Sequence, residues 1–166
     1  MTQHILGIAQ TNFAFFLRFL PEIKLLLLFE LIAKYTIMKN VTKIIKTSII
    51  GPEIHNKVSL LEWFLNTDEK TVHGYDKFYW NGITTLQWSK ICNSMINDFE
   101  SYDVLNIPTS NRVSKYELLE IIKDVFNKDI EIKKNSKVES ERCLKKTDGM
   151  PHLDIKTLLK ELKDFY

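Results

Sequence analysis

Apolar residues recur every three or four positions in three segments of the chain, which predicts three amphipathic helices. We expect them over residues 84–99, over 114–126 and from residue 154 onward, begun by the capping residues Thr84, Ser114 and Asp154. Their apolar faces consist of Trp88, Ile91, Cys92, Met95, Ile96 and Phe99; of Leu118, Ile121, Ile122, Val125 and Phe126; and of Ile155, Leu158, Leu159, Leu162 and Phe165.

Short segments rich in β-branched residues lie between these helices. Strands are expected over 43–50, 70–75, 104–107 and 130–133, and the first of them ends at Gly51-Pro52. Ser59 and Glu62 have the spacing of a capping box, which predicts a short helix over 59–65. Strands that alternate with helices indicate an α/β domain whose sheet is at least partly parallel.

Residues 1–40 form a segment unlike the α/β domain predicted over 41–166. Its apolar runs, at 13–17 and 25–29, are interrupted by charged residues and by Pro21, which predicts two apolar helices rather than a membrane span. Helices that are apolar nearly all round need a partner surface. Residues 1–38 could therefore dock on a partner chain, and weak association with a membrane is the alternative.

Charge and cysteine usage exclude several classes of function. The net charge of +2 comes from dispersed residues, so we expect no nucleic-acid partner. The two cysteines and four histidines have no metal-ligand spacing. We therefore expect no metal site. We also expect a cytoplasmic protein, because free cysteines suit a reducing compartment.

Candidate chemistry is sparse along the chain. The five glycines are too far apart for a G-x-G-x-x-G or phosphate-binding loop, so we expect no dinucleotide site in this chain alone. Tyr75, Phe78, Tyr79 and Trp80 form an aromatic group beside Asn81. Such a group either packs in the core or stacks a base or a sugar, and both interpretations stay open.

Four segments, in this order, resemble one known family: KTSIIGPEI (46–54), SLLEWFL (59–65), GYDKFYWNGITTLQWSKIC (74–92) and NIPTSNRVSKYELLEIIKDVF (106–126). They are similar to the C-terminal half of extended short-chain dehydrogenases/reductases that act on nucleotide sugars, such as the dTDP-4-dehydrorhamnose reductase group. The resemblance implies an incomplete Rossmann-like sheet and a small C-terminal substrate-binding subdomain, whereas the apolar helices expected in residues 1–40 lie outside it.

The resemblance also implies a site. Glu53, Trp80 and Asn81 would face a UDP- or dTDP-linked sugar, and Arg142 would bind its phosphates, since a guanidinium matches phosphate oxygens. The alternative for Arg142 is a surface position. Family members of the rhamnose group often carry Trp where this chain has Ile49, so the chain departs here from the pattern for that sugar.

The family's proton-transferring Tyr-x-x-x-Lys pair has a formal match in Tyr35 and Lys39. We interpret it as a chance match, because a full helix should separate the pair from the strand that begins near Lys43. NAD(P)H is implied for an intact relative but not for this chain. We therefore expect the substrate-binding portion of a reductase or epimerase, not catalytic by itself, with a partner chain as one possible source of the missing half.

Overall fold

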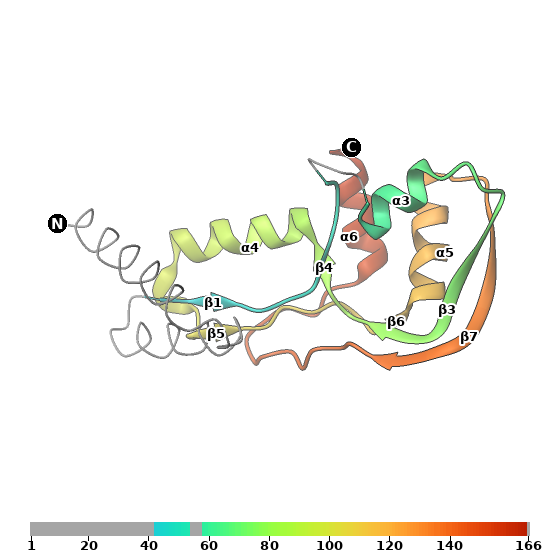
Figure 1. Cartoon of the computed structure of the whole chain (residues 1–166). Helices are drawn as coiled ribbons and strands as arrows, with labels where there is room; N and C mark the ends of the chain where they lie inside the picture. The colour runs from blue at the N-terminus through green and yellow to red at the C-terminus, as the bar shows by residue number, and fades with distance from the viewer. Residues whose placement is uncertain (1–41, 54–57, 166) are drawn as a thin grey trace, which may run out of the picture. The chain divides into compact units, whose positions relative to one another are not determined.

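Three small sheets and four α-helices make up the part of the chain that the computed structural model describes, residues 42–53 and 58–165. From Lys43 onward the chain forms a unit of its own. The predicted apolar helices, Tyr35 and Lys39 lie outside the described residues, and so does docking through residues 1–38. Figure 1 shows the order of the elements. Strands alternate with helices, and parallel pairs are present, as the sequence predicted.

The segment predicted as one strand over 43–50 is two short strands. β1 (Ile44–Ile45) pairs in parallel with β5 (Leu105–Asn106), whereas β2 (Ile49–Ile50) pairs in parallel with β4 (Ile83–Thr84). The switch occurs between them, because the Lys46 N–H still donates to the Asn106 carbonyl at 2.9 Å while the Ser48 carbonyl accepts from the Ile83 N–H at 2.9 Å. One extended segment thus joins two sheets.

The largest sheet has the order β6-β3-β7, with β3 (Thr71–Trp80) in the centre. β3 runs parallel to β7 (Glu131–Glu141) and antiparallel to β6 (Val113–Ser114). The strands predicted over 70–75 and 130–133 are therefore only the beginnings of β3 and β7. The prediction stopped early in β7 because most of its residues are polar and exposed, as is usual for an edge strand.

The helices begin where the capping residues predicted. They are α3 (Leu60–Asn66), α4 (Thr85–Asn97), α5 (Lys115–Phe126) and α6 (Ile155–Lys163), and the 3-10 helix η1 (Phe99–Ser101) follows α4. The hydroxyls of Thr84 and Ser114 and the carboxylate of Asp154 each accept a backbone N–H of the first turn. Only Ser114 forms a complete capping box among the described helices, with Glu117.

The core lies between the helices and the large sheet, and Figure 1 shows α5 alongside β3 and β7. Phe64, Ile122 and Leu159 are fully buried there. The predicted apolar face of α4 is partly wrong: Ile91 and Met95 are buried, but Trp88 and Ile96 are exposed. Among the described elements α4 packs mainly on α6, β4 and β2, and these contacts bury only part of the face. Phe165 follows the end of α6 and is exposed too.

Candidate functional site

A cavity of about 660 Å³ lies between the segment around β2, the end of β3 and the residues that follow β7. Its volume is within the usual range for small-molecule sites. The cavity is lined by Glu53, Trp80 and Arg142, three of the four substrate-binding residues expected from the resemblance, and by Thr47 and Ser48. Asn81 does not line it. We call this cavity the β2–β7 pocket.

Trp80 forms one wall of the β2–β7 pocket. The indole is buried, and its Nε1–H donates to the Ser48 hydroxyl at 2.7 Å. Gly82 permits this arrangement, since a Cβ there would lie 2.1 Å from the Ser48 carbonyl oxygen and 2.2 Å from the Trp80 ring. Strand alternation puts Phe78 on the same face of β3 as Trp80, and Phe78 also lines the pocket. The aromatic group thus contributes to core and pocket together.

Asn81 is committed to the protein backbone. Its amide Nδ2–H donates to the Leu144 carbonyl at 2.8 Å, and its Oδ1 accepts from the Leu144 N–H at 2.9 Å. The side chain is buried. It therefore ties the end of β3 to the segment that carries Arg142, and its direct contact with a substrate stays a prediction.

Glu53 is also held by backbone groups. Its Oε2 accepts from the N–H of Val58 at 2.7 Å and from the N–H of Ser59 at 2.8 Å, at the start of α3. The capping-box spacing predicted that the Glu62 carboxylate accepts the Ser59 N–H. In the structure the Glu53 carboxylate accepts it instead. Ile49 and Leu60 add apolar surface to the pocket beside Glu53.

Three cationic side chains line the β2–β7 pocket: Lys46, Lys115 and Arg142. Among the described residues that line it, Glu53 carries the sole carboxylate, and none of the three cations forms an ion pair with a described residue. The Lys115 ammonium lies 4.1 Å from the centre of the Phe78 ring. Lys46 and Lys115 were missed from the sequence, because no local motif marks a lysine that reaches a pocket through sheet pairing.

A different charged group, the pair Arg112 and Glu141, lies beside Tyr79, whose side chain points away from Phe78 and Trp80. Arg112 stacks on the Tyr79 ring at 3.3 Å and forms an ion pair with Glu141 at 2.9 Å. The hydrogen bond between Arg112 and Glu141 raises the pKa of the guanidinium and lowers the pKa of the carboxyl. Burial, followed by the hydrogen bond to Glu141, raises the pKa of the Cys143 thiol to about 11. Here the positive charge is compensated, unlike the charges in the pocket.

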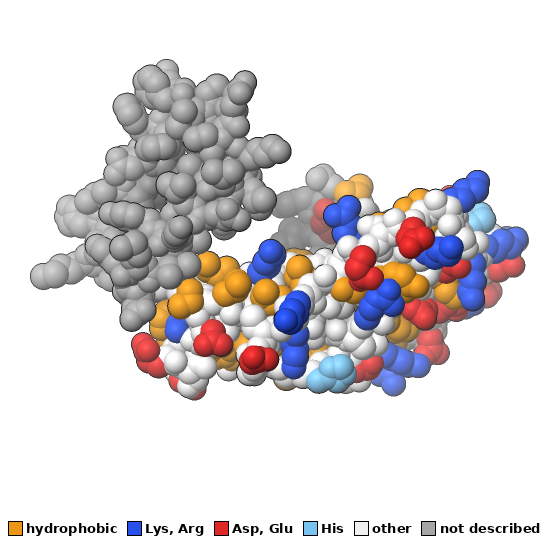
Figure 2. All heavy atoms as spheres, turned by 90° about the horizontal axis from the view of Figure 1, so that it is seen from below, with side chains coloured by type: hydrophobic (Ala, Val, Ile, Leu, Met, Phe, Trp, Pro, Cys, Tyr) orange, Lys and Arg blue, Asp and Glu red, His pale blue; other side chains and the backbone are white. Residues whose placement is uncertain are grey.

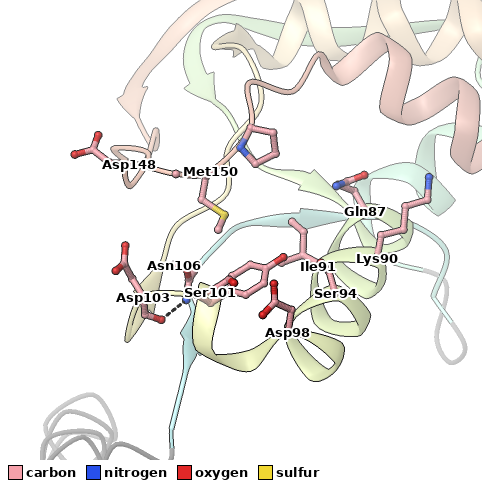
Figure 3. A pocket seen from close by; sticks show the side chains of 13 residues that line it. Gln87, Lys90, Ile91, Ser94, Asp98, Ser101, Asp103, Asn106, Asp148 and Met150 are labelled. Atoms are coloured by element: carbon pink, nitrogen blue, oxygen red, sulfur yellow. Dashed lines mark hydrogen bonds between the residues drawn. The ribbon is translucent and has the colours of Figure 1, made fainter.

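A second cavity, of about 500 Å³, lies between α4 and the loop around Gly149 (Figure 3). None of the predicted site residues lines it. Its Lys90 is paired with Glu161 at 2.7 Å, and the amide of its Asn106 donates to the Asp103 carbonyl at 2.7 Å. The buried amide of Asn106 is thus already bonded within the protein, and the residues that the resemblance selected line the other cavity, so we regard the β2–β7 pocket as the candidate site.

Figure 2 shows the charged side chains on one face of the molecule. On the face seen in Figure 2, basic and acidic side chains are interspersed and form no continuous basic stripe of the kind that nucleic acids bind. Within residues 42–53 and 58–165, no group of histidine, cysteine and carboxylate side chains is arranged to hold a metal ion. None of the helices in these ranges is long and apolar enough to cross a bilayer.

The described residues do not form the glycine-rich cradle that a dinucleotide diphosphate needs. Gly51 follows β2, Gly74 lies within β3 and Gly82 follows β3, so their backbones do not make one loop. A Cβ on Gly74 would meet the Tyr116 backbone, which shows that this glycine serves helix packing. That this chain alone binds no dinucleotide stays a prediction.

Comparison with known proteins gives structural matches alone. No protein-family model matches the chain, and no curated protein sequence does. A dTDP-4-dehydrorhamnose reductase from Clostridium acetobutylicum matches with a TM-score of 0.59 and 16% identity, over 74% of this chain and 48% of that one. The reductase from Bacillus anthracis, solved in complex with NADP, matches with a TM-score of 0.60 and 11% identity over 73% and 47%.

A third structure widens the comparison to another reaction. The dTDP-glucose 4,6-dehydratase from Bacillus anthracis, in complex with NAD, has a TM-score of 0.54 and 13% identity, over 81% of this chain and 47% of that one. The resemblance read from the sequence is thus confirmed at the level of the fold. The chain has a partial Rossmann-like α/β fold shared with nucleotide-sugar reductases and a dehydratase, and it spans about half the length of these structures.

Proposed function

We propose that residues 41–166 are the substrate-binding portion of an NAD(P)-dependent nucleotide-sugar reductase or epimerase. In this proposal the β2–β7 pocket holds a UDP- or dTDP-linked sugar. The observation that carries it is the joint placement of Glu53, Trp80 and Arg142 around one cavity, together with lining cations that form no ion pair with a described residue. The solved reductases and the dehydratase, whose names refer to dTDP-sugars, support the choice of substrate class.

The pocket has the two kinds of surface that such a ligand requires. Arg142 offers charge-assisted hydrogen bonds to phosphate oxygens. Trp80, Ile50 and Leu118 offer apolar area for a base or a sugar ring. Both surfaces would contribute to the free energy of binding. The cationic surface would orient the phosphates, and the apolar surface would exclude water.

In this proposal the chain does not catalyse the reaction alone. The hydride would come from NAD(P)H bound by a half that the described residues do not include, and a partner chain could supply it. The free thiols of Cys92 and Cys143 suit a reducing cytoplasm, which is the location we propose.

Isothermal titration calorimetry of the full chain with dTDP-glucose and UDP-glucose tests the proposal. We expect saturable binding of at least one of them, and Arg142→Met should weaken it roughly tenfold or more because a charge-assisted contact is lost. Arg112→Met is the matched control, since Arg112 lies on the opposite face of the same sheet and pairs with Glu141. The proposal fails if neither ligand binds, or if both variants weaken binding equally.

A further inference from the structure

We infer that Lys115 is a second phosphate-binding residue of the β2–β7 pocket, held by the Phe78 ring and acting together with Arg142. The inference rests on the proposed function, because it concerns the same pocket and a ligand with two adjacent phosphates.

The sheet order brings the two cations to one place. β6 lies on one side of β3 and β7 on the other, and Tyr79 of β3 is in register with both Ser114 and Glu141. Lys115 follows Ser114 in the chain, and Arg142 follows Glu141. The two residues therefore flank the end of β3 from opposite sides, and both line the cavity beside Phe78 and Trp80.

The backbone at both positions is well anchored. Lys115 is the first residue of α5, directly after the capping box, in which the Glu117 N–H donates to the Ser114 hydroxyl at 3.1 Å and the Glu117 carboxylate accepts from the Ser114 N–H at 2.6 Å. The Arg142 N–H donates to the Tyr79 carbonyl at 3.0 Å. Because both backbones are already ordered, the conformational entropy lost when a ligand binds comes mainly from the two side chains.

The interaction of Lys115 differs from that of paired lysines in this structure. Lys90 and Lys156 have their charges compensated by Glu161 and Asp124. The Lys115 ammonium instead lies against an aromatic ring, 4.1 Å from its centre, and the side chain is half-buried. A ring face orients an ammonium group without neutralising its charge. Its N–H donors thus stay available for an anion in the pocket.

Two separate cations on either side of one strand end match a diphosphate better than a single phosphate. Each phosphoryl group can face one cation, and each contact is a charge-assisted hydrogen bond. A nucleoside monophosphate would leave one cation without a partner. The pocket should therefore bind dTDP-glucose and dTDP more tightly than dTMP, and Lys115 should account for part of that difference.

Calorimetry on the full chain tests this with Lys115→Met and the matched control Lys123→Met. Lys123 lies in the last turn of the same helix and does not line the pocket. We expect Lys115→Met to bind dTDP-glucose roughly ten- to hundredfold more weakly, and to bind dTMP with a smaller loss. Lys123→Met should bind both as the unmodified chain does. Lys115→Arg retains the charge and should recover most of the affinity, which separates the loss of charge from damage to the fold.

The outcomes separate the two proposals. If the unmodified chain binds dTDP-glucose and Lys115→Met binds it equally well, the inference about Lys115 is wrong while the proposed function stands. Equal weakening by Lys115→Met and Lys123→Met would overturn it as well, because the effect would then be one of overall charge. If the unmodified chain binds no nucleotide sugar, the proposed function fails and the inference fails with it.

Discussion

Replacing Asn81 by alanine should destabilise the protein, because this side chain makes two hydrogen bonds to one backbone unit. The Leu144 carbonyl accepts from the Asn81 amide at 2.8 Å, and the Leu144 N–H donates to it at 2.9 Å. In the variant both backbone groups lose this partner. An unsatisfied buried polar group costs about 1–3 kcal/mol. Leu144 is half-buried, so water replaces part of each bond. We therefore expect Asn81→Ala to lower the free energy of unfolding by about 2–3 kcal/mol.

Urea unfolding of the full chain, followed by circular dichroism, measures this loss. The midpoint should fall while the slope against denaturant stays the same, as it does when stability changes without a change in the exposed surface. Asn97→Ala is the control, because Asn97 is exposed at the end of α4 and its amide bonds only within that helix. It should change the free energy of unfolding by less than about 0.5 kcal/mol.

The same variant distinguishes two roles for Asn81. In the structure Asn81 positions the segment that carries Arg142, so binding of dTDP-glucose should weaken together with stability. A residue that simply contacts the ligand would weaken binding and leave the unfolding midpoint unchanged. That second result, or an Asn81→Ala protein within about 0.5 kcal/mol of the unmodified chain, would refute our reasoning.

Two further predictions concern a helix start and a thiol. Ser114→Ala removes the hydroxyl of the capping box and should lower the free energy of unfolding in urea by about 1 kcal/mol. The control Ser89→Ala, at an exposed position inside α4, should lower it by less than half of that. Equal losses would contradict a stabilising role of the cap. With its pKa raised to about 11, Cys143 is almost entirely a neutral thiol at pH 8.5. Its alkylation by iodoacetamide, measured by mass spectrometry, should be on the order of a hundredfold slower than that of a free cysteine. The alkylation rate should increase as the pH rises through 10. Glu141→Gln should speed that alkylation, since it removes a carboxylate that raises the pKa of the thiol, and an unchanged rate would argue against the contact.

The helices could be predicted from the sequence because their signals are local. The spacing of Ser114 and Glu117 lies within one turn, and the structure confirms both hydrogen bonds. The apolar face of α4 was predicted too broadly, because the period of a helix does not tell how wide its partner surface is. Trp88 and Ile96 have the right spacing and are still exposed.

The strands and the pocket depend on pairing between distant segments. β7 is long and mostly polar, and it became recognisable only as the parallel partner of β3. The resemblance pointed to Glu53, Trp80 and Arg142, because in the family these distant segments contribute to one substrate site. Lys115 could not, because its place depends on the order β6-β3-β7 and on its contact with Phe78.

The most direct test of the proposed site uses the indole N–H signals of the three tryptophans in an NMR titration. Trp80 lines the β2–β7 pocket and its Nε1–H is bonded to Ser48, whereas Trp63 and Trp88 do not line the pocket and serve as internal controls. We predict that dTDP-glucose moves the Trp80 signal saturably, leaves the Trp88 signal in place, and is not matched by NADPH at the same concentration. A saturable response to NADPH, or a nucleotide sugar that shifts Trp88 and not Trp80, would contradict the account of this chain as the substrate-binding portion of a nucleotide-sugar enzyme.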